Sequence, residues 1–256
     1  MHQLFSDAQA VVRKKGYSYL VMFSMKFVMW KVFGRILILV AIRRFRNLAT
    51  ETESIEGAVR VAFEFSFLGM SIAPSQVEQE VSELLSLVRD IKPKTVMEIG
   101  SARGGTLFLF TRVASPDAAL LSIDLPEGRF GGGYPKHMIP LFRSFADKGQ
   151  SIHLIRADSH SPETLNEVRK VLGRRSLDFL FIDGDHTYEG VRRDFEMYSP
   201  LVREGGAIAF HDICPGPAEK VGGVPDFWQE ISAKQACRSI VKDHRQSGCG
   251  IGVLNL

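Results

Sequence analysis

Cysteine is scarce in this sequence, with three residues in a chain of 256. Cys214, Cys237 and Cys249 are too few and too irregularly spaced for a disulfide framework or for a four-cysteine zinc site. The sequence is therefore not that of a small secreted disulfide-rich protein, and the reducing cytoplasm suits it best. A chain of this length accommodates one α/β domain and a short additional segment.

Long uninterrupted apolar runs are also absent. Residues 17–42 are rich in large apolar side chains, but Lys26, Lys31 and Arg35 interrupt them. The longest clean run, residues 36–42, is far below the roughly 20 residues of a membrane span. The stretch also starts too late and carries too many charges for a secretory signal. Two interpretations fit: a helix packed on the main domain or on a second subunit of a homo-oligomer, and an interfacial helix at the inner face of the membrane.

A strong charge of one sign is missing as well. Lysine and arginine number 32 against 29 aspartate and glutamate residues, and much of this small excess lies in the first fifty residues. The remainder of the chain is close to neutral. Because a protein that binds nucleic acid needs a basic groove or stripe on its main body, we expect no nucleic-acid partner.

Short apolar runs alternate with helical patterns beyond residue 94. They are residues 95–99, 119–123, 152–155, 177–182 and 207–210. Such runs predict a parallel sheet that helices cover on both faces. Two further runs, residues 239–241 and 251–254, indicate a closing hairpin. An amphipathic helix over residues 76–88, capped by Ser75, leads into the first strand, so we expect a main domain over 76–256 and an N-terminal helical extension over 1–75.

The carboxyl ends of the first three predicted strands carry a glycine-rich loop and two acids. The loop, residues 98–105, turns into a helix whose free amides favour electronegative groups. Asp124 follows the second strand and can accept hydrogen bonds from both ribose hydroxyls of a nucleotide. Asp158, beside Ser159, suits an adenine amine. The dinucleotide fingerprint needs a glycine where Ala102 stands, so the loop fits that fingerprint poorly.

These motifs resemble the successive cofactor motifs of class I S-adenosylmethionine-dependent methyltransferases. The resemblance extends from about residue 95 to the end of the chain and rests on Glu98-x-Gly100-x-x-x-Gly104, Asp124 and Asp158. Residues 181–191 and 209–212 are similar to the subgroup related to cephalosporin-pathway and sugar O-methyltransferases. The resemblance implies methyl transfer and a Rossmann-like seven-stranded sheet, mostly parallel with an antiparallel last strand. It also implies a cofactor site made of Glu98, Gly100, Ser101, Gly104, Gly105, Asp124, Asp158, Ser159 and Asp183.

A polar cluster follows the fourth and fifth predicted strands. Asp183 and His186 come after one strand, and His211 and Asp212 come after the next, so neighbouring strand ends bring them to one crevice. Two carboxylates with imidazole or water ligands suit a hard divalent ion such as Mg²⁺, which would lower the pKa of an acceptor hydroxyl. Metal-dependent relatives have acids at these strand ends, which implies Asp183, His211 and Asp212 as ligands. In the alternative, metal-free site, His186 or His211 is the general base.

Two other classes of function remain open from the sequence. A nucleotide-dependent oxidoreductase would share the sheet and the ribose acid, but it would need the fingerprint that Ala102 interrupts. A non-catalytic Rossmann-like binding protein would have no need of four converging polar side chains. For a methyltransferase, the resemblance favours a hydroxyl on a sugar, glycolipid or other small molecule as acceptor. A lipid-linked sugar would also account for an interfacial N-terminal helix.

Overall fold

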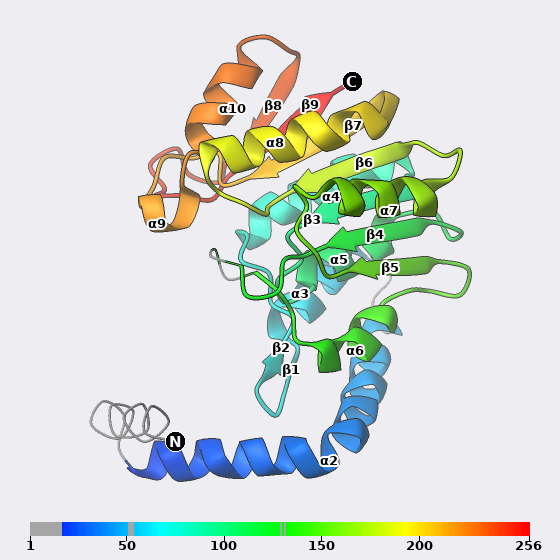
Figure 1. Cartoon of the computed structure of the whole chain (residues 1–256), viewed down its shortest axis with the longest axis vertical. Coiled ribbons are helices and arrows are strands. Elements are labelled where there is room, and N and C mark those ends of the chain that lie inside the picture. Colours follow the sequence, from blue (N-terminus) through cyan, green and yellow to red (C-terminus); the bar gives the residue numbers. More distant parts are fainter. Residues whose placement is uncertain (1–16, 51–53, 129, 131) are drawn as a thin grey trace. The chain divides into compact units, whose positions relative to one another are not determined.

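The computed structural model describes residues 17–50, 54–128, 130 and 132–256 (Figure 1). Residues 1–16 and 51–53 of the predicted N-terminal extension lie outside this part of the chain. The chain divides into two compact units, residues 1–44 and 45–256. The unit that contains the sheet therefore begins earlier than residue 76, because the helix and hairpin of residues 54–71 belong with it.

A long helix, α2 (Tyr17–Thr50), occupies most of the described N-terminal region, as the sequence pattern predicted. It consists of 34 residues. Within the described residues, no helix combines the length and the apolarity that a membrane crossing requires. The side chains from Phe33 onward include several exposed apolar groups, namely Phe33, Ile36, Leu39 and Val40.

Seven strands form one sheet in the second unit, as predicted. They are β3 (Thr95–Ile99), β4 (Ala119–Ile123), β5 (Ser151–Ile155), β6 (Leu177–Ile182), β7 (Val202–His211), β8 (Cys237–Ile240) and β9 (Ile251–Asn255). Their spatial order is β5-β4-β3-β6-β7-β9-β8. Strands β3 to β7 pair in parallel, whereas β9 is antiparallel to both β7 and β8. The predicted Rossmann-like sheet with an antiparallel last strand and a closing hairpin is confirmed.

Helices cover both faces of this sheet (Figure 1). One group consists of α3 (Ile55–Glu64), α4 (Glu78–Ile91) and α5 (Gly105–Val113), which contact one another. On the other face, α7 (Pro162–Leu172), α8 (Tyr188–Tyr198) and α10 (Val224–Ser232) pack on a shared core with Met97, Leu121, Leu180 and Ile208. Short elements complete the fold: β1 (Ser66–Phe67), β2 (Met70–Ser71), α6 (Ile139–Arg143) and α9 (Ala218–Val221).

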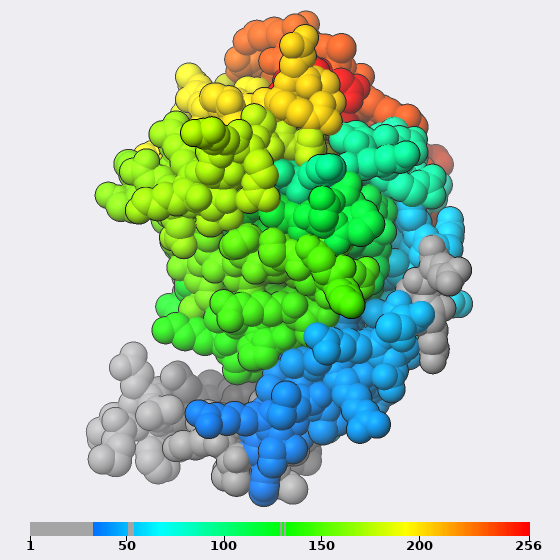
Figure 2. Space-filling model, turned by 90° about the vertical axis from the view of Figure 1, so that its right-hand side faces the viewer, coloured from blue at the N-terminus to red at the C-terminus, as the bar shows by residue number. Residues whose placement is uncertain are grey.

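The central strands are buried on both sides, which explains their continuous apolar sequences. Every residue of β3 and β4 is buried. A parallel strand with helices above and below has no solvent face, so polar alternation is lost. The five parallel strands, β3 to β7, end on the same side of the molecule (Figure 1). Figure 2 shows the face of the molecule that is on the right in Figure 1. Ligand-binding residues are expected at the carboxyl edge.

The helix before the first sheet strand starts later than the pattern predicted. Helix α4 begins at Glu78, and its N-cap is Val77, which makes no side-chain cap hydrogen bond. The prediction that Ser75 caps this helix was therefore wrong. Ser75 instead lines a cavity at the carboxyl edge of the sheet, and the Gln76 side chain turns toward Asp183. Ser75 and Gln76 thus form a bend at the candidate site, ahead of the helix.

Candidate active site

A cavity of about 290 Å³ lies at the carboxyl edge of the sheet. Residues at the ends of all five parallel strands line it: Ile99 and Gly100, Ile123 and Asp124, Ala157 and Asp158, Asp183 and Gly184, and His211 and Asp212. Strand ends meet at this edge because the five strands are parallel and in register. The structure therefore places the predicted loop, the two acids and the polar cluster around one cavity.

Gly100 is required by the packing of the sheet itself. Its φ is +89°, and a Cβ built on it would lie 1.9 Å from the backbone oxygen of Asp183. The reason is that the turn after β3 crosses directly over the end of β6. A Gly100→Val substitution would disturb that crossing whether or not a cofactor is bound.

Asp124 lies at the end of β4, where backbone amides hold its carboxylate. One oxygen accepts a hydrogen bond from the Ala102 amide at 2.6 Å, and the other accepts one from the Gly133 amide at 2.7 Å. Burial raises the pKa of Asp124, while these hydrogen bonds act in the opposite direction. The carboxylate is thus positioned on the cavity wall, between the glycine-rich loop and the loop after β4.

Four of the predicted cofactor residues do not line the cavity: Glu98, Ser101, Gly104 and Gly105. Glu98 is fully buried, and the Thr106 hydroxyl donates to it. Burial raises the pKa of Glu98 to about 8. The hydroxyls of Ser101 and Ser122 share a hydrogen bond. The buried side chains of Glu98 and Ser101 thus bond within the protein, whereas Gly100, Asp124, Asp158, Ser159 and Asp183 line the cavity.

Asp158 and Ser159 form the part of the cavity wall after β5. The Asp158 side chain is 55% exposed, and its carboxylate accepts from the His160 amide at 2.9 Å. The Ser159 carbonyl accepts from the Tyr198 hydroxyl at 2.6 Å. His160, to which the sequence analysis assigned no role, also lines the cavity and pairs with the buried Asp194 at 3.2 Å. The Asp158 carboxylate therefore remains accessible to a ligand.

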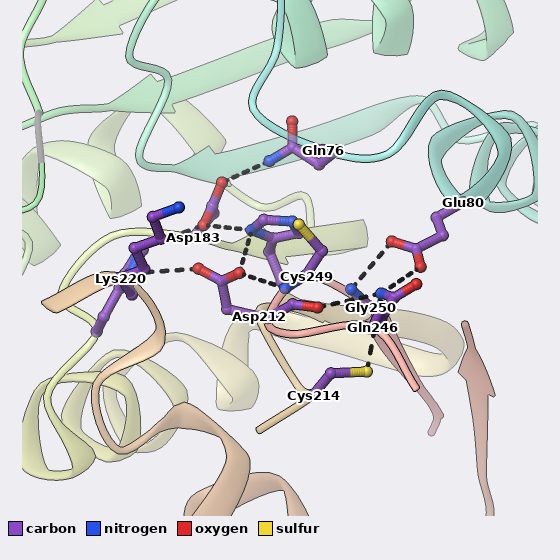
Figure 3. Close-up of polar contacts among 12 residues, drawn as sticks. Gln76, Glu80, Asp183, Asp212, Cys214, Lys220, Gln246, Cys249 and Gly250 are labelled. Carbon is purple, nitrogen blue, oxygen red and sulfur yellow. Dashed lines mark hydrogen bonds and ion pairs between the residues drawn. The ribbon is translucent and has the colours of Figure 1, made fainter. Parts of the chain in front are cut away.

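Asp183 is the centre of the polar cluster (Figure 3). Its Oδ1 lies 3.2 Å from Nδ1 of His211 and 3.4 Å from Nε2 of His186. Its Oδ2 accepts from Nε2 of Gln76 at 2.7 Å. Burial acts to raise the pKa of Asp183, but the two imidazoles outweigh it and hold this pKa well below its usual range. The carboxylate is therefore charged at neutral pH.

His186 lies between the two carboxylates. Its Nδ1 is 3.3 Å from Oδ2 of Asp212 and also donates to the Lys220 carbonyl. Burial acts to lower the pKa of His186, but the hydrogen bond and the charge of Asp183 raise it to about 9. Phe130 stacks on the imidazole, with ring centroids 4.7 Å apart and planes at 16°. Both ring nitrogens face oxygen acceptors, which is the environment of an imidazolium.

His211 is the more deeply buried of the two imidazoles, with 4% of its surface exposed. Its Nδ1 lies 3.2 Å from Asp183 and 3.5 Å from Asp212, whereas its Nε2 has no hydrogen-bond partner. Burial acts to lower the pKa of His211, but the charge of Asp183 raises it well above the usual value. Asp212 follows with φ of +61°, and its Oδ1 accepts from the Cys249 amide at 3.0 Å.

The cluster offers two groups of side chains that are able to hold a metal ion. One consists of Asp183, His186 and Asp212, and the other of His211, Asp212 and Cys249; within each, the ligand atoms lie within 4.8 Å of one another. The predicted ligands Asp183, His211 and Asp212 are thus divided between two groups that share Asp212. The first group fits a cation with oxygen ligands, because its two carboxylates are already oriented by hydrogen bonds.

Gln76, Phe130 and Cys249 contact the polar cluster, and none of them was predicted from the sequence. The apolar periodicity of residues 76–88 predicts that Gln76 is a polar position of a helix, and Phe130 lies in a loop between predicted elements. Of the three, only Cys249 has neighbours that suggest an unusual turn, because Gly248 and Gly250 flank it. Each of the three reaches the cluster from a segment far away in the sequence or outside the regular elements. Local pattern therefore contained no information on their contacts.

Residues 97–213 match the family model described as a methyltransferase domain. This part of the chain is similar to methyltransferase domains. It spans the strands β3 to β7, and it contains Asp124, Asp158, Asp183 and His211. The family suggested by the cofactor motifs is therefore supported by a comparison that covers these residues.

Two curated relatives are similar over part of their length. An uncharacterized protein of Sinorhizobium fredii is 28% identical over 171 residues, which are 66% of this chain and 18% of that protein. An uncharacterized protein of Acanthamoeba polyphaga mimivirus is 31% identical over 118 residues, which are 46% of this chain and 51% of that protein. The chain thus spans about half or less of the length of these relatives.

A solved structure confirms the class I methyltransferase fold. The O-methyltransferase from Bacillus cereus, in complex with S-adenosylhomocysteine (SAH), superimposes with a TM-score of 0.53 at 17% identity. The match covers 79% of this chain and 90% of that one. At this identity the similarity concerns the arrangement of strands and helices, and the roles of individual residues are argued from the cavity itself.

Proposed function

We propose that this protein is an S-adenosylmethionine-dependent methyltransferase that transfers the methyl group to a hydroxyl. The observation that carries the proposal is the position of the cluster of Asp183, His186, His211 and Asp212. These four side chains line the same cavity as Gly100 and Asp124. A cofactor held by the glycine-rich loop would therefore face groups that bind and deprotonate an acceptor. O-methyltransferases of the same fold, such as the Bacillus cereus structure with SAH, add support.

The cofactor would extend along the strand ends. Asp124 is positioned to accept hydrogen bonds from the ribose hydroxyls, and the exposed carboxylate of Asp158 to accept one from the adenine amine, with Ser159 beside it. Gly100, whose turn packs against the backbone after β6, would line the part of the cavity that holds the methionine. The sulfonium is a good leaving group, so the protein must align the acceptor, exclude water and remove one proton.

A divalent cation such as Mg²⁺ would be held by Asp183 and Asp212. A bound cation lowers the pKa of an acceptor hydroxyl and orients it. The carboxylates fit this role because each is charged or hydrogen-bonded and both face the cavity. Without a cation, His186 or His211 would take the proton, and the raised pKa of each means that it must first lose the proton it already holds.

The proposed acceptor is a hydroxyl on a sugar, glycolipid or other small molecule. The oxidoreductase alternative is disfavoured because residues 97–213 match a methyltransferase domain and Ala102 interrupts the dinucleotide fingerprint. A non-catalytic binding protein would have no use for two carboxylates and two imidazoles on a cavity wall, since burying such groups costs free energy.

The decisive test is methyl transfer from labelled cofactor. Purified protein and S-adenosylmethionine with a labelled methyl group are incubated with fractionated cell extract, and the labelled product is identified. We expect the label in a methyl ether that forms on a hydroxyl of a small molecule or glycan. Calorimetric titration with S-adenosylmethionine and with NAD runs in parallel. Binding of NAD alone would favour the oxidoreductase, and cofactor binding without transfer into any fraction would favour a binding protein.

The helix α2 is proposed to contact a membrane surface or a second subunit without crossing the bilayer. Its exposed Phe33, Ile36, Leu39 and Val40 would enter the headgroup region, with Arg35 beside them. Alkaline carbonate extraction of cell membranes should therefore release the protein into the supernatant, while an integral membrane protein in the same sample stays in the pellet. Retention of this protein in the pellet would contradict the prediction. Flotation with anionic and neutral vesicles then distinguishes lipid from protein contact.

A further inference from the structure

The thiol of Cys249 lies beside His211, on the loop between β8 and β9. Cys249 does not line the cavity, and the proposed transfer reaction makes no use of its side chain. Nevertheless, one potential ligand atom each from His211, Asp212 and Cys249 lies within 4.8 Å of the other two. This second group of ligands shares Asp212 with the first group, but it contains His211 and Cys249 in place of Asp183 and His186.

The imidazole of His211 is arranged like that of a metal ligand. Its Nδ1 pairs with the carboxylates of Asp183 and Asp212, at 3.2 and 3.5 Å. Its Nε2 is buried without a hydrogen-bond partner. A buried polar atom without a partner destabilises the folded protein, so a ligand that pairs with it is favoured. Histidines that bind metals commonly donate their other N–H to a carboxylate, which fixes the ring, and that half of the arrangement is present here.

The loop that carries the thiol is held in place from several sides. Cys249 has φ of +57° between Gly248 and Gly250, which also have positive φ. The buried carboxylate of Glu80 accepts from the Gly250 amide at 2.9 Å and, as Figure 3 shows, also contacts Gln246. The Cys249 amide donates to Asp212 and its carbonyl accepts from the Cys214 amide at 2.9 Å. The position of the thiol is therefore set before any ligand arrives.

We propose that His211, Asp212 and Cys249 bind a divalent ion of the zinc class. Thiolate, imidazole and carboxylate are the ligands that Zn²⁺ and Co²⁺ accept, whereas Mg²⁺ prefers oxygen. Nε2 of His211 is the nitrogen left for the ion, and three protein ligands leave a fourth position for water. This inference does not depend on the proposed methyl transfer. It concerns a binding site that adjoins the cavity through the shared Asp212.

Cobalt tests the site directly, because a Co²⁺–thiolate bond produces a charge-transfer absorption in the near ultraviolet. The protein is freed of metal with a chelator, dialysed, and titrated with Co²⁺ and then Zn²⁺. We expect the band to saturate at one equivalent of Co²⁺ and to disappear when Zn²⁺ replaces it. Excess Mg²⁺ should leave the band in place.

The three cysteines of the chain provide matched variants. Cys249→Ser should lose the band and at least about tenfold of the Zn²⁺ affinity, which corresponds to 1.4 kcal/mol. Cys214→Ser and Cys237→Ser should keep both. His211→Gln, with its fold checked by circular dichroism, should also lose the band. A band that survives in Cys249→Ser, or that depends on the exposed Cys237, would overturn the proposal.

The outcomes also distinguish this site from the proposed function. The cobalt band requires neither cofactor nor acceptor, so it persists if methyl transfer is never found. Conversely, transfer activity in a protein that shows no band at stoichiometric Co²⁺ overturns the zinc-class site alone. Rapid alkylation of Cys249 by iodoacetamide without any cobalt band would likewise overturn it, and would indicate a thiolate–imidazolium pair instead.

Discussion

Asp124→Ala should lower the affinity for S-adenosylmethionine by about 100-fold. The expected loss is two hydrogen bonds from ribose hydroxyls to a charged group, each of which contributes about 1.5 kcal/mol, and each 1.4 kcal/mol changes affinity about tenfold. In the free protein, the same oxygens accept from the amides of Ala102 and Gly133. The substitution therefore also releases the loop that closes over this end of the cavity. Isothermal titration measures the effect directly.

Asp117 provides the matched control at the other end of the same strand. Asp117 precedes β4 and is exposed, so Asp117→Ala changes the net charge equally without touching the cavity. It should leave the affinity unchanged. Asp124→Asn, which keeps one acceptor oxygen, should fall between the wild type and Asp124→Ala. If Asp124→Ala binds S-adenosylmethionine with wild-type affinity and its circular dichroism shows an unchanged fold, the assignment of Asp124 to the ribose is wrong.

Chelation and the variant Asp183→Asn together should separate the two mechanisms of proton removal. If a cation at Asp183 and Asp212 activates the acceptor, chelation removes most of the activity and Mg²⁺ or Mn²⁺ restores it in the wild type. Asp183→Asn should then fail even with excess metal, because the amide is a much weaker ligand. Cofactor affinity has to be measured in the same variant, since Asp183 also lines the cavity where the cofactor would bind.

The pH dependence reports on the metal-free alternative. The pKa of His186 is raised to about 9 by Asp183, so at neutral pH the imidazole is protonated and cannot accept a proton. If His186 is the base, activity should rise about tenfold per pH unit from neutral pH up to about 9. Asp183→Asn removes the anion that favours the imidazolium. Any residual activity should then show its midpoint at lower pH, toward the ordinary value of about 6.5.

Asp185 provides the comparison for this pH profile. Its carboxylate accepts from the Thr187 amide at 2.9 Å, and Asn is able to keep that hydrogen bond. Asp185→Asn should therefore leave the midpoint of the profile where it is in the wild type. Full activity after exhaustive chelation, with no metal in the purified protein, would contradict a role for a cation and leave a histidine as the base. An activity that does not change between pH 6 and 9 would instead contradict the assignment of a histidine as the base.

The positions of the parallel strands along the chain and the residues at their carboxyl ends were predictable from the sequence. Buried parallel strands need continuous apolar segments, so the runs that end at Ile99, Ile123 and Ile182 could be located directly. Because parallel strands end at one edge, Gly100, Asp124 and Asp183 were expected to share a cavity, and they do. This reasoning uses only local pattern and a topological rule, which is why it succeeded.

Contacts between segments far apart in the chain were decided by the tertiary structure alone. Gln76 reaches Asp183 across 107 positions, and the Gly250 amide reaches Glu80 across 170. No periodicity records such pairs, because it reflects burial along a single element. The raised pKa values of His186 and His211 likewise depend on two carboxylates from different strands. The sequence determined which chemical groups arrive at the edge of the sheet, whereas folding decided which of them pair, since electrostatic energy depends on distances of a few ångströms.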